Sequence, residues 1–294
     1  MRRYYLSVLL ILMGLSFVVT LSSCNDLGNL PPATYSTDLG MNYVIVLAPT
    51  RFTMGSPEGE RGRSGNELQH EVELTRPFYI QTTEVTQSQF QEVMGSNPSF
   101  YQDCGTDCPA ENVTWYQAVE FCNQLSDREG LPHAYTIAGT EVTWNQSANG
   151  YRLPTEAEWE YVARNATTDS ALPTGNLLAE EVDSCVMDTN LDPIAWYCGN
   201  SSGITHRVAQ KTDTYPGVFD MHGNVWEWCW DWYGQYTADT AVDPTGPDTG
   251  TRKVLRGGSA YESPRGCRSA NRTNKDPDTG GLVGFRTVRN VVGE

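Results

Sequence analysis

Basic residues are scarce in this chain. Its 294 residues include 20 lysines and arginines against 36 aspartates and glutamates, which gives a net charge of −16. A general nucleic-acid binder needs a basic face, because its affinity comes from releasing counterions from phosphates. The composition therefore argues against nucleic-acid partners, and equally against a polybasic protein of the membrane surface.

Histidines are also few, and tandem repeats are absent. The four histidines are far apart in the sequence, so no clustered iron site is expected, and we interpret each as a solvated loop side chain. They are His70, His133, His206 and His222. With 27 glycines, 16 prolines and 11% aromatic residues, the composition is typical of a turn-rich globular protein.

The N-terminus predicts export. Arg2 and Arg3 precede an apolar run over residues 4–19, which is shorter than the roughly 20 residues that span a bilayer comfortably. A basic start, a short apolar run and small residues predict a signal peptide over residues 1–23. The small residues running into Cys24 resemble a bacterial lipobox, which implies cleavage before Cys24 and a lipid on its sulfur. The alternative is an uncleaved membrane anchor.

Residues 24–40 contain glycine, proline, serine, threonine and aspartate with little apolar content, and we interpret them as a lipidated tether. Residues 41–294 then form the folded domain. No second hydrophobic span follows, so we predict an exported, membrane-anchored lipoprotein of the cell envelope. Asn25 is not an aspartate, which favours the outer membrane if the cell has two membranes.

The cysteines fit an oxidising compartment, where most should be paired. Cys104 and Cys108 enclose three residues, and no second close pair exists that would complete a zinc site. We predict disulfides Cys104–Cys108 and Cys185–Cys198. The remaining cysteines are Cys122, Cys229 and Cys267, whose pairing the sequence leaves open. The chain has eight cysteines, and seven remain after Cys24; because seven is odd, at least one is free or pairs between molecules.

Three segments begin with the capping-box pattern of a helix, in which a threonine is followed three residues later by glutamine or glutamate. They start at Thr86, Thr114 and Thr155. Strand-like segments are short, and the clearest runs over residues 225–233, where four tryptophans recur at every second position. Few helices, many short strands and long loops predict an α+β domain.

The tryptophan row has two interpretations. Trp226, Trp228, Trp230 and Trp232 could form a platform that stacks sugars, but such a row more often belongs to a core, and we favour the core. Several arginines are spread through the same half of the chain. They are Arg152, Arg256, Arg268, Arg272 and Arg286, and we expect several of them to be buried and paired with acids.

An ordered set of strings resembles the formylglycine-generating enzyme, or sulfatase-modifying factor, family. The strings are FTMGS (52–56), TEVT (83–86), ENVTW (111–115), YRLPTEAEWEY (151–161), GNVWEW (223–228), RGGS (256–259), RSANR (268–272) and GFR (284–286). The resemblance covers about residues 42–290. It implies a fold related to C-type lectins with little regular secondary structure.

The resemblance also implies a chemistry. Family enzymes use O₂ to oxidise a client cysteine to formylglycine, with two thiolates holding Cu(I) linearly. Counted from the Gly-Gly-Ser string, the two thiolate positions correspond to Glu262 and Cys267. Counted back from Arg268, a three-residue deletion makes Cys267 a neighbouring structural position. On either count the first thiolate is absent, and a hard carboxylate cannot replace it on Cu(I).

Other catalytic groups are not evident in this region. Ser259 lacks the Gly-x-Ser-x-Gly context of a nucleophile, and we interpret it as a serine that forms hydrogen bonds in a glycine turn. Cys267, Ser259 and Glu262 therefore occupy the family's active-site region without a predicted catalytic role. Whether the chain is an enzyme stays open, and the missing thiolate argues against Cu(I) as its cofactor.

A calcium site is expected near residues 220–227. Ca²⁺ prefers six to eight oxygen ligands from carboxylates and carbonyls. The resemblance implies that the side chains of Asp220 and Glu227 and the carbonyls of Gly223 and Val225 bind it. The alternative is that Asp220 caps a turn and Glu227 pairs with an arginine.

Three functions remain in competition. The first is a divergent family member that has lost the copper pair and acts as a binding or scaffold module. The second is a formylglycine-generating oxidase that acts on exported clients. The third is a lectin-like binder of glycans or peptides that uses the former substrate cleft. The tether, the acidic surface and Glu262 favour the first function. The expected partners are the membrane, through the lipid, and a protein or glycan ligand.

Overall fold

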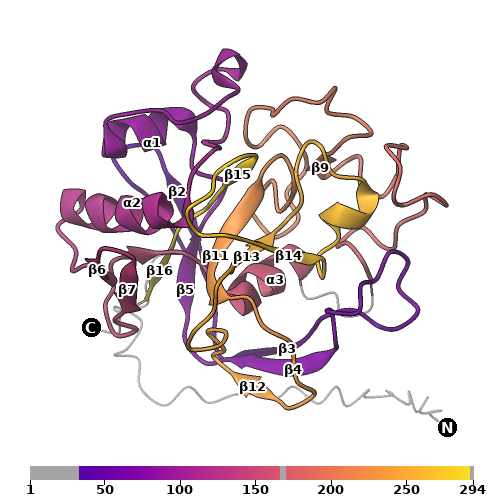
Figure 1. Ribbon diagram of the computed structural model, residues 1–294, viewed down its shortest axis with the longest axis horizontal. Helices are drawn as coiled ribbons and strands as arrows, with labels where there is room; N and C mark the ends of the chain where they lie inside the picture. The colour runs from indigo at the N-terminus through magenta and orange to yellow at the C-terminus, as the bar shows by residue number, and fades with distance from the viewer. Residues whose placement is uncertain (1–32, 166–169, 292–294) are drawn as a thin grey trace, which may run out of the picture. The chain divides into compact units, whose positions relative to one another are not determined.

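The computed structural model describes residues 33–165 and 170–291 (Figure 1). The predicted signal peptide, Cys24 and most of the predicted tether lie outside the described residues. Over the described ranges, no helix has both the length and the apolar character needed to span a membrane.

The three predicted helices are confirmed, each with its capping box. They are α1 (Gln87–Met94), α2 (Trp115–Arg128) and α3 (Glu156–Arg164), and in each the threonine hydroxyl accepts from the backbone N–H three residues later. Two short 3₁₀ turns, η1 (Gln102–Cys104) and η2 (Pro264–Cys267), interrupt the loops.

Short strands form several small sheets, so the α+β prediction is confirmed. The largest sheet has the order β1 (Thr34–Ser36), β2 (Asn42–Val46), β5 (Phe78–Gln81), β16 (Val288–Asn290) and β8 (Tyr151–Arg152). This sheet contains strands from both ends of the described chain. β1 and β2 come from the start, and β16, from the end, lies between β5 and β8.

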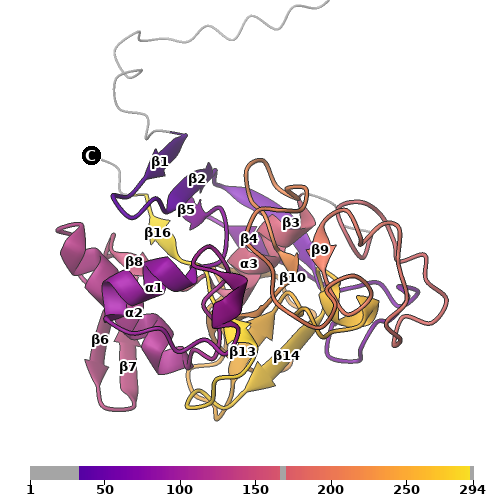
Figure 2. The ribbon, with the colours of Figure 1, turned by 90° about the horizontal axis from the view of Figure 1, so that it is seen from above.

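A second sheet carries the tryptophan row. Its order is β14 (Arg272–Lys275), β13 (Lys253–Arg256), β11 (Trp226–Trp232) and β15 (Val283–Gly284), as Figure 2 shows for β13 and β14. The smaller sheets comprise β12 (Ala241–Val242), β4 (His70–Leu74) and β3 (Thr50–Met54); β6 (Tyr135–Ala138) with β7 (Glu141–Trp144); and β9 (Ala195–Trp196) with β10 (His222–Gly223).

The tryptophans pack into the core, as the favoured interpretation held. Trp228 is fully buried, and the other three are partly buried. The ammonium of Lys253 lies 3.7 Å from the ring centre of Trp232 and 4.7 Å from that of Trp230. The protein's own cation therefore covers the rings of Trp230 and Trp232, so the four rings do not form a continuous open row for sugars to stack on.

All five predicted arginines are buried and paired with acids. Arg152 pairs with Glu158, Arg268 with Glu60 and Glu67, Arg272 with Glu156, and Arg286 with Glu227, at N–O distances of 2.6–2.7 Å; Arg256 pairs with Glu160. Most of these contacts join residues more than 50 positions apart. They connect loops that lack the hydrogen-bond ladders of regular structure.

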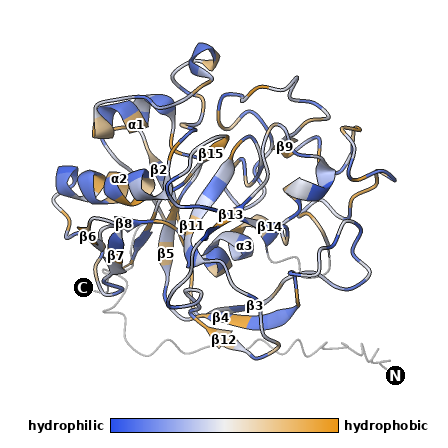
Figure 3. Cartoon of the chain, in the orientation of Figure 1, coloured by the Kyte–Doolittle hydropathy of each residue, from blue (hydrophilic) through white to orange (hydrophobic). Residues whose placement is uncertain are grey.

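Hydrophilic residues occur in α3 and in the strands of the second sheet (Figure 3), and several of these residues are charged and buried. Glu160 is fully buried between Arg164 and Arg256. Burial alone would raise the pKa of Glu160, but the two guanidinium charges outweigh it and lower that pKa. The ionised form therefore stabilises the fold above the pKa of an unfolded glutamate, and this contribution is lost as the pH falls through the folded value.

We predict that Glu160→Gln destabilises the protein by about 3–5 kcal/mol, because it removes the charge of the buried carboxylate that both Arg164 and Arg256 contact. Urea unfolding monitored by tryptophan fluorescence measures the change. The control is Glu73→Gln, which removes a pair with the exposed Arg51 and should cost about 0–1 kcal/mol. Equal effects of the two variants would contradict the assigned role of Glu160.

Candidate functional site

An open groove of about 650 Å³ lies over the second sheet. Its floor includes Trp226 from β11, Leu255 from β13 and Thr273 from β14, and one wall is the loop over residues 259–266. Ser259 and Glu262, two of the residues predicted to occupy the family's active-site region, line it. Cys267, the third, does not belong to its lining.

Glu262 sits in the groove as a partly buried carboxylate. Trp226 Nε1 donates to Glu262 Oε1 at 3.3 Å, and the backbone carbonyl of Glu262 accepts from the Cys198 amide at 3.0 Å. The side chain lies against Gly266, where an added Cβ would come within 3.0 Å of Oε2. The loop thus holds a carboxylate at the position where the resemblance implies a copper thiolate.

Cys267 is a core residue. Its side chain is fully buried, in an apolar cluster with Ala171, Leu172 and Tyr197. Burial raises the pKa of the Cys267 thiol far above its usual range, and the charge of Glu262 adds to the rise. The thiol therefore stays protonated at neutral pH and faces away from solvent, which matches the count that makes it a neighbouring structural position.

Ser259 has the predicted turn role. Its hydroxyl accepts from the Tyr261 amide at 3.3 Å, and its carbonyl accepts from the Glu262 amide at 2.9 Å. His70 and His222 correct the expectation of solvated loop histidines. His70 is buried on β4, and His222 is fully buried with Nδ1 at 2.7 Å from the carbonyl oxygen of Cys267. Burial lowers the pKa of His222 to about 4, so the ring is neutral.

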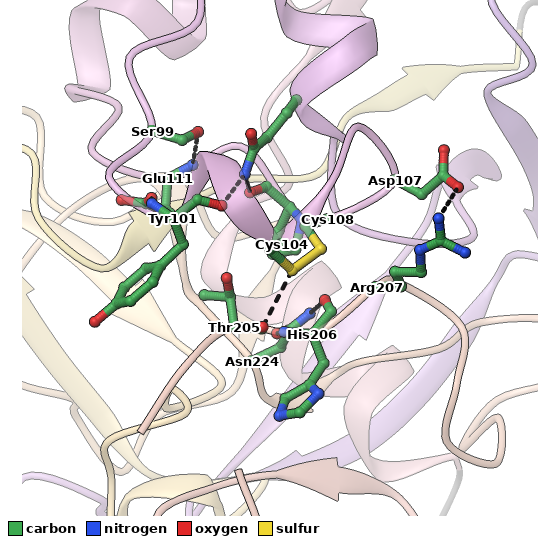
Figure 4. The surroundings of a disulfide bond; sticks show 12 residues. Ser99, Tyr101, Cys104, Asp107, Cys108, Glu111, Thr205, His206, Arg207 and Asn224 are labelled. Atoms are coloured by element: carbon green, nitrogen blue, oxygen red, sulfur yellow. Dashed lines mark hydrogen bonds and ion pairs between the residues drawn. A yellow bond between two sulfur atoms is a disulfide. The ribbon is translucent and has the colours of Figure 1, made fainter. Parts of the chain in front are cut away.

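The structure contains both predicted disulfides, Cys104–Cys108 and Cys185–Cys198. The three other cysteines within the described ranges are free, buried thiols. Figure 4 shows that the Cys104–Cys108 loop contacts the segment around Thr205. Cys104 Sγ lies 3.1 Å from the carbonyl oxygen of Thr205.

This disulfide loop adjoins the rim of the groove. Tyr101, which precedes η1, forms a short hydroxyl–hydroxyl hydrogen bond with Tyr261, which lines the groove. Glu111 is fully buried and accepts from the Tyr101 amide at 2.8 Å. Tyr261 is 53% exposed at the groove, and Phe100, the residue before Tyr101, is 71% exposed.

The predicted calcium ligands lie in a buried acidic region. Glu227 is engaged on both oxygens, since Arg286 donates to Oε1 at 2.7 Å and to Oε2 at 2.8 Å, and Trp159 Nε1 donates to Oε2 at 2.9 Å. This is the arginine pairing that the alternative interpretation named. Asp220 Oδ2 accepts from the Ala209 amide at 2.6 Å.

Glu84 is a member of this region that sequence reasoning missed. It is fully buried, and its Oε1 has no hydrogen-bond partner among the described residues. Burial raises the pKa of Glu84 well above its usual range, and the charges of Asp220 and Glu227 raise it further. Its only sequence clue was its place in the TEVT string, where nothing marks it as an oxygen ligand.

A bound cation would balance the excess of acidic groups in this region. Three buried carboxylates face the single guanidinium of Arg286, and an unpartnered carboxylate oxygen is costly without a counter-charge. Within the described ranges, no three His, Cys, Asp or Glu side chains are arranged to hold a metal ion. A cation here would thus depend on Glu84, Asp220 and backbone carbonyls, with Glu227 retained by Arg286.

Comparisons with known proteins agree with this architecture. Residues 34–291 match the sulfatase-modifying factor enzyme 1-like domain. The chain is 34% identical over 275 residues to "Chaperone protein LppX" of Paenibacillus barcinonensis, covering 86% of this chain and 88% of that protein. It is 29% identical over 287 residues to the formylglycine-generating enzyme of Streptomyces coelicolor, covering 82% and 87%.

Solved structures show the same fold. Treponema denticola variable protein 1 superposes with a TM-score of 0.76 and 32% identity over 89% of this chain and all of that chain. PvdO from Pseudomonas aeruginosa superposes with a TM-score of 0.69 and 25% identity over the same shares.

We predict that Ca²⁺ binds at the acidic region of Glu84 and Asp220. Because a ligand of the folded state stabilises by RT ln(1 + [L]/Kd), a hundredfold excess over Kd contributes about 2.7 kcal/mol. EDTA should lower the melting temperature, added Ca²⁺ should restore it, and Glu84→Gln should remove most of this response. Differential scanning fluorimetry measures all three.

The matched control is Glu111→Gln. Glu111 is also a fully buried glutamate with an unpartnered oxygen, but its other oxygen holds the Tyr101 amide. This variant should keep the full response to Ca²⁺. A melting temperature that EDTA does not change, or a response to Ca²⁺ that persists in Glu84→Gln, would refute the site.

Proposed function

This chain belongs to the sulfatase-modifying factor enzyme 1-like family, and on that premise we propose that it is an exported, lipid-anchored binding module without oxidase activity. Its ligand is polypeptide, held in the groove that carries Glu262. The module uses the family's groove as a docking surface and leaves the client's covalent structure unchanged.

The observation that carries the proposal is the state of the two thiolate positions. Glu262 supplies a hard carboxylate, and Cys267 is a buried, protonated thiol outside the groove lining. Linear Cu(I) binding needs two soft thiolates at fixed separation. The groove itself remains open at about 650 Å³, so the binding surface exists without the redox centre.

Two further points support a polypeptide ligand. A relative that covers most of the chain is named a chaperone, a class of protein that binds other polypeptides. The exposed side chain of Tyr261 at the groove supplies apolar surface of the kind that contacts unfolded chains. The lectin-like and oxidase functions remain the alternatives that the test must distinguish.

Anchoring through Cys24 completes the proposal. Small residues precede Cys24 after a short apolar run, and two disulfides belong to an oxidising compartment. A lipid on Cys24 would hold the domain at the cell envelope. Because β1 (Thr34–Ser36) already pairs with β2, the tether ends before Thr34 and is shorter than the predicted 24–40. In a cell with two membranes the outer membrane is the proposed location.

We predict no formylglycine in a Cys-x-Pro-x-Arg peptide incubated with the full chain, copper and reductant, as measured by peptide mass. The same protein should suppress light scattering by chemically denatured citrate synthase at near-stoichiometric ratios. Peptide oxidation that disappears in Cys267→Ser would replace this proposal with the oxidase. Absence of any effect on the denatured protein, together with glycan binding on an array, would replace it with the lectin-like function.

We predict that Cys24→Ser leaves an unprocessed precursor, since the lipid is attached before the signal peptide is removed. Immunoblotting of cells with and without globomycin measures the precursor and the mature form. Cys122→Ser changes a buried cysteine in the domain and should leave processing intact. Normal maturation of the Cys24→Ser protein would refute the lipid anchor.

A further inference from the structure

The groove contains a carboxylate that the protein does not neutralise. Among the described residues, Glu262 receives one side-chain hydrogen bond, from Trp226 Nε1, and has no cationic partner. The lining contains three cations. Arg265 pairs with Asp183 at 3.0 Å, Arg272 pairs with Glu156 at 2.6 Å, and Lys275 on β14 forms no ion pair with Glu262 among the described residues. A charge held in this way is available to a positively charged group of a ligand.

Aromatic side chains flank this carboxylate. Trp226 lies beside it, and Tyr261 precedes it at the rim of the groove. Aromatic faces attract ammonium and guanidinium groups, and they also pack against the apolar stem of a lysine or arginine. The surroundings of Glu262 therefore suit a basic side chain better than a neutral sugar.

The strand that borders the groove has an open edge. β14 is the last strand of its sheet, and all four of its residues line the groove. Asn66 Nδ2 donates to the Arg272 carbonyl at 3.3 Å, but no backbone group outside the sheet bonds to Thr273, Asn274 or Lys275 in the described part of the chain.

The opposite edge of the same sheet is covered. The Val113 amide donates to the Val283 carbonyl at 3.2 Å, and the Asn112 amide donates to the Gly281 carbonyl at 2.6 Å. The fold thus closes one edge with its own chain and leaves the edge at the groove free. An exposed edge strand is a template for a further strand from another polypeptide.

We propose that the groove binds an extended polypeptide segment that pairs with the free edge of β14 and places a lysine or arginine side chain against Glu262. This rests on the proposed function and adds the class of ligand and its mode of recognition. Main-chain hydrogen bonds along β14 give affinity for many sequences, and Glu262 selects among them. The net charge of −16 favours the approach of basic segments.

The test uses a labelled heptapeptide, acetylated and amidated, of sequence Thr-Val-Thr-Arg-Thr-Val-Thr, and its twin with citrulline in place of arginine. Fluorescence anisotropy with the full chain should show at least tenfold tighter binding of the arginine peptide. Glu262→Gln should bind the two peptides equally. Glu141→Gln, an exposed change on β7, should keep the wild-type preference.

Strand pairing is tested on the peptide, so that folding of the protein is not at issue. In an added strand, alternate amides face the neighbouring strand. N-methylation of one alternating set should abolish binding, and methylation of the other set should leave it within about threefold.

Three results would overturn the inference. Equal affinity for both peptides in the wild type, or a preference that survives Glu262→Gln, removes the role of Glu262. Equal effects of the two methylated sets remove the pairing with β14. These failures are distinct from failure of the proposed function, which the denatured-protein and oxidation assays decide separately.

Discussion

Pairing of buried arginines with buried carboxylates holds this fold together. Regular structure is sparse, so long loops must be fixed to one another by side chains. Arg268 connects two acids of the 56–67 loop to the segment after η2, and Arg286 connects β11 to the chain before β16. Removing one partner leaves a charge without solvation in the interior, and this cost makes the loop positions mutually dependent.

The wall of the groove is held by contacts within the protein. The loop over 259–266 is positioned by hydrogen bonds of its own backbone, by Cys198 and by packing of Gly258 on Cys267. None of these contacts needs a metal. The side chain at position 262 can therefore set the chemistry of the groove without a change of fold.

Sequence reasoning succeeded where the determinant is local or where pairing is obligatory. The capping boxes at Thr86, Thr114 and Thr155 each need only four residues, and a buried arginine requires an acid even when the sequence does not say which one. It failed where burial depends on distant segments. Neither the enclosure of His222 nor the unpartnered Glu84 oxygen has a signature in its neighbouring residues. Ala163 of α3 and Cys267 of η2 enclose His222, and Asp220 and Glu227 lie near Glu84, all of them distant in sequence.

A binding groove and a copper centre differ in whether the folded protein takes up Cu(I). Competitive titration of Cu(I) from a chromogenic chelator into the folded protein distinguishes them. We expect no transfer of Cu(I) to the native chain, and transfer only after denaturation exposes Cys122, Cys229 and Cys267. Stoichiometric transfer to the native protein that is lost in Cys267→Ser would contradict this expectation.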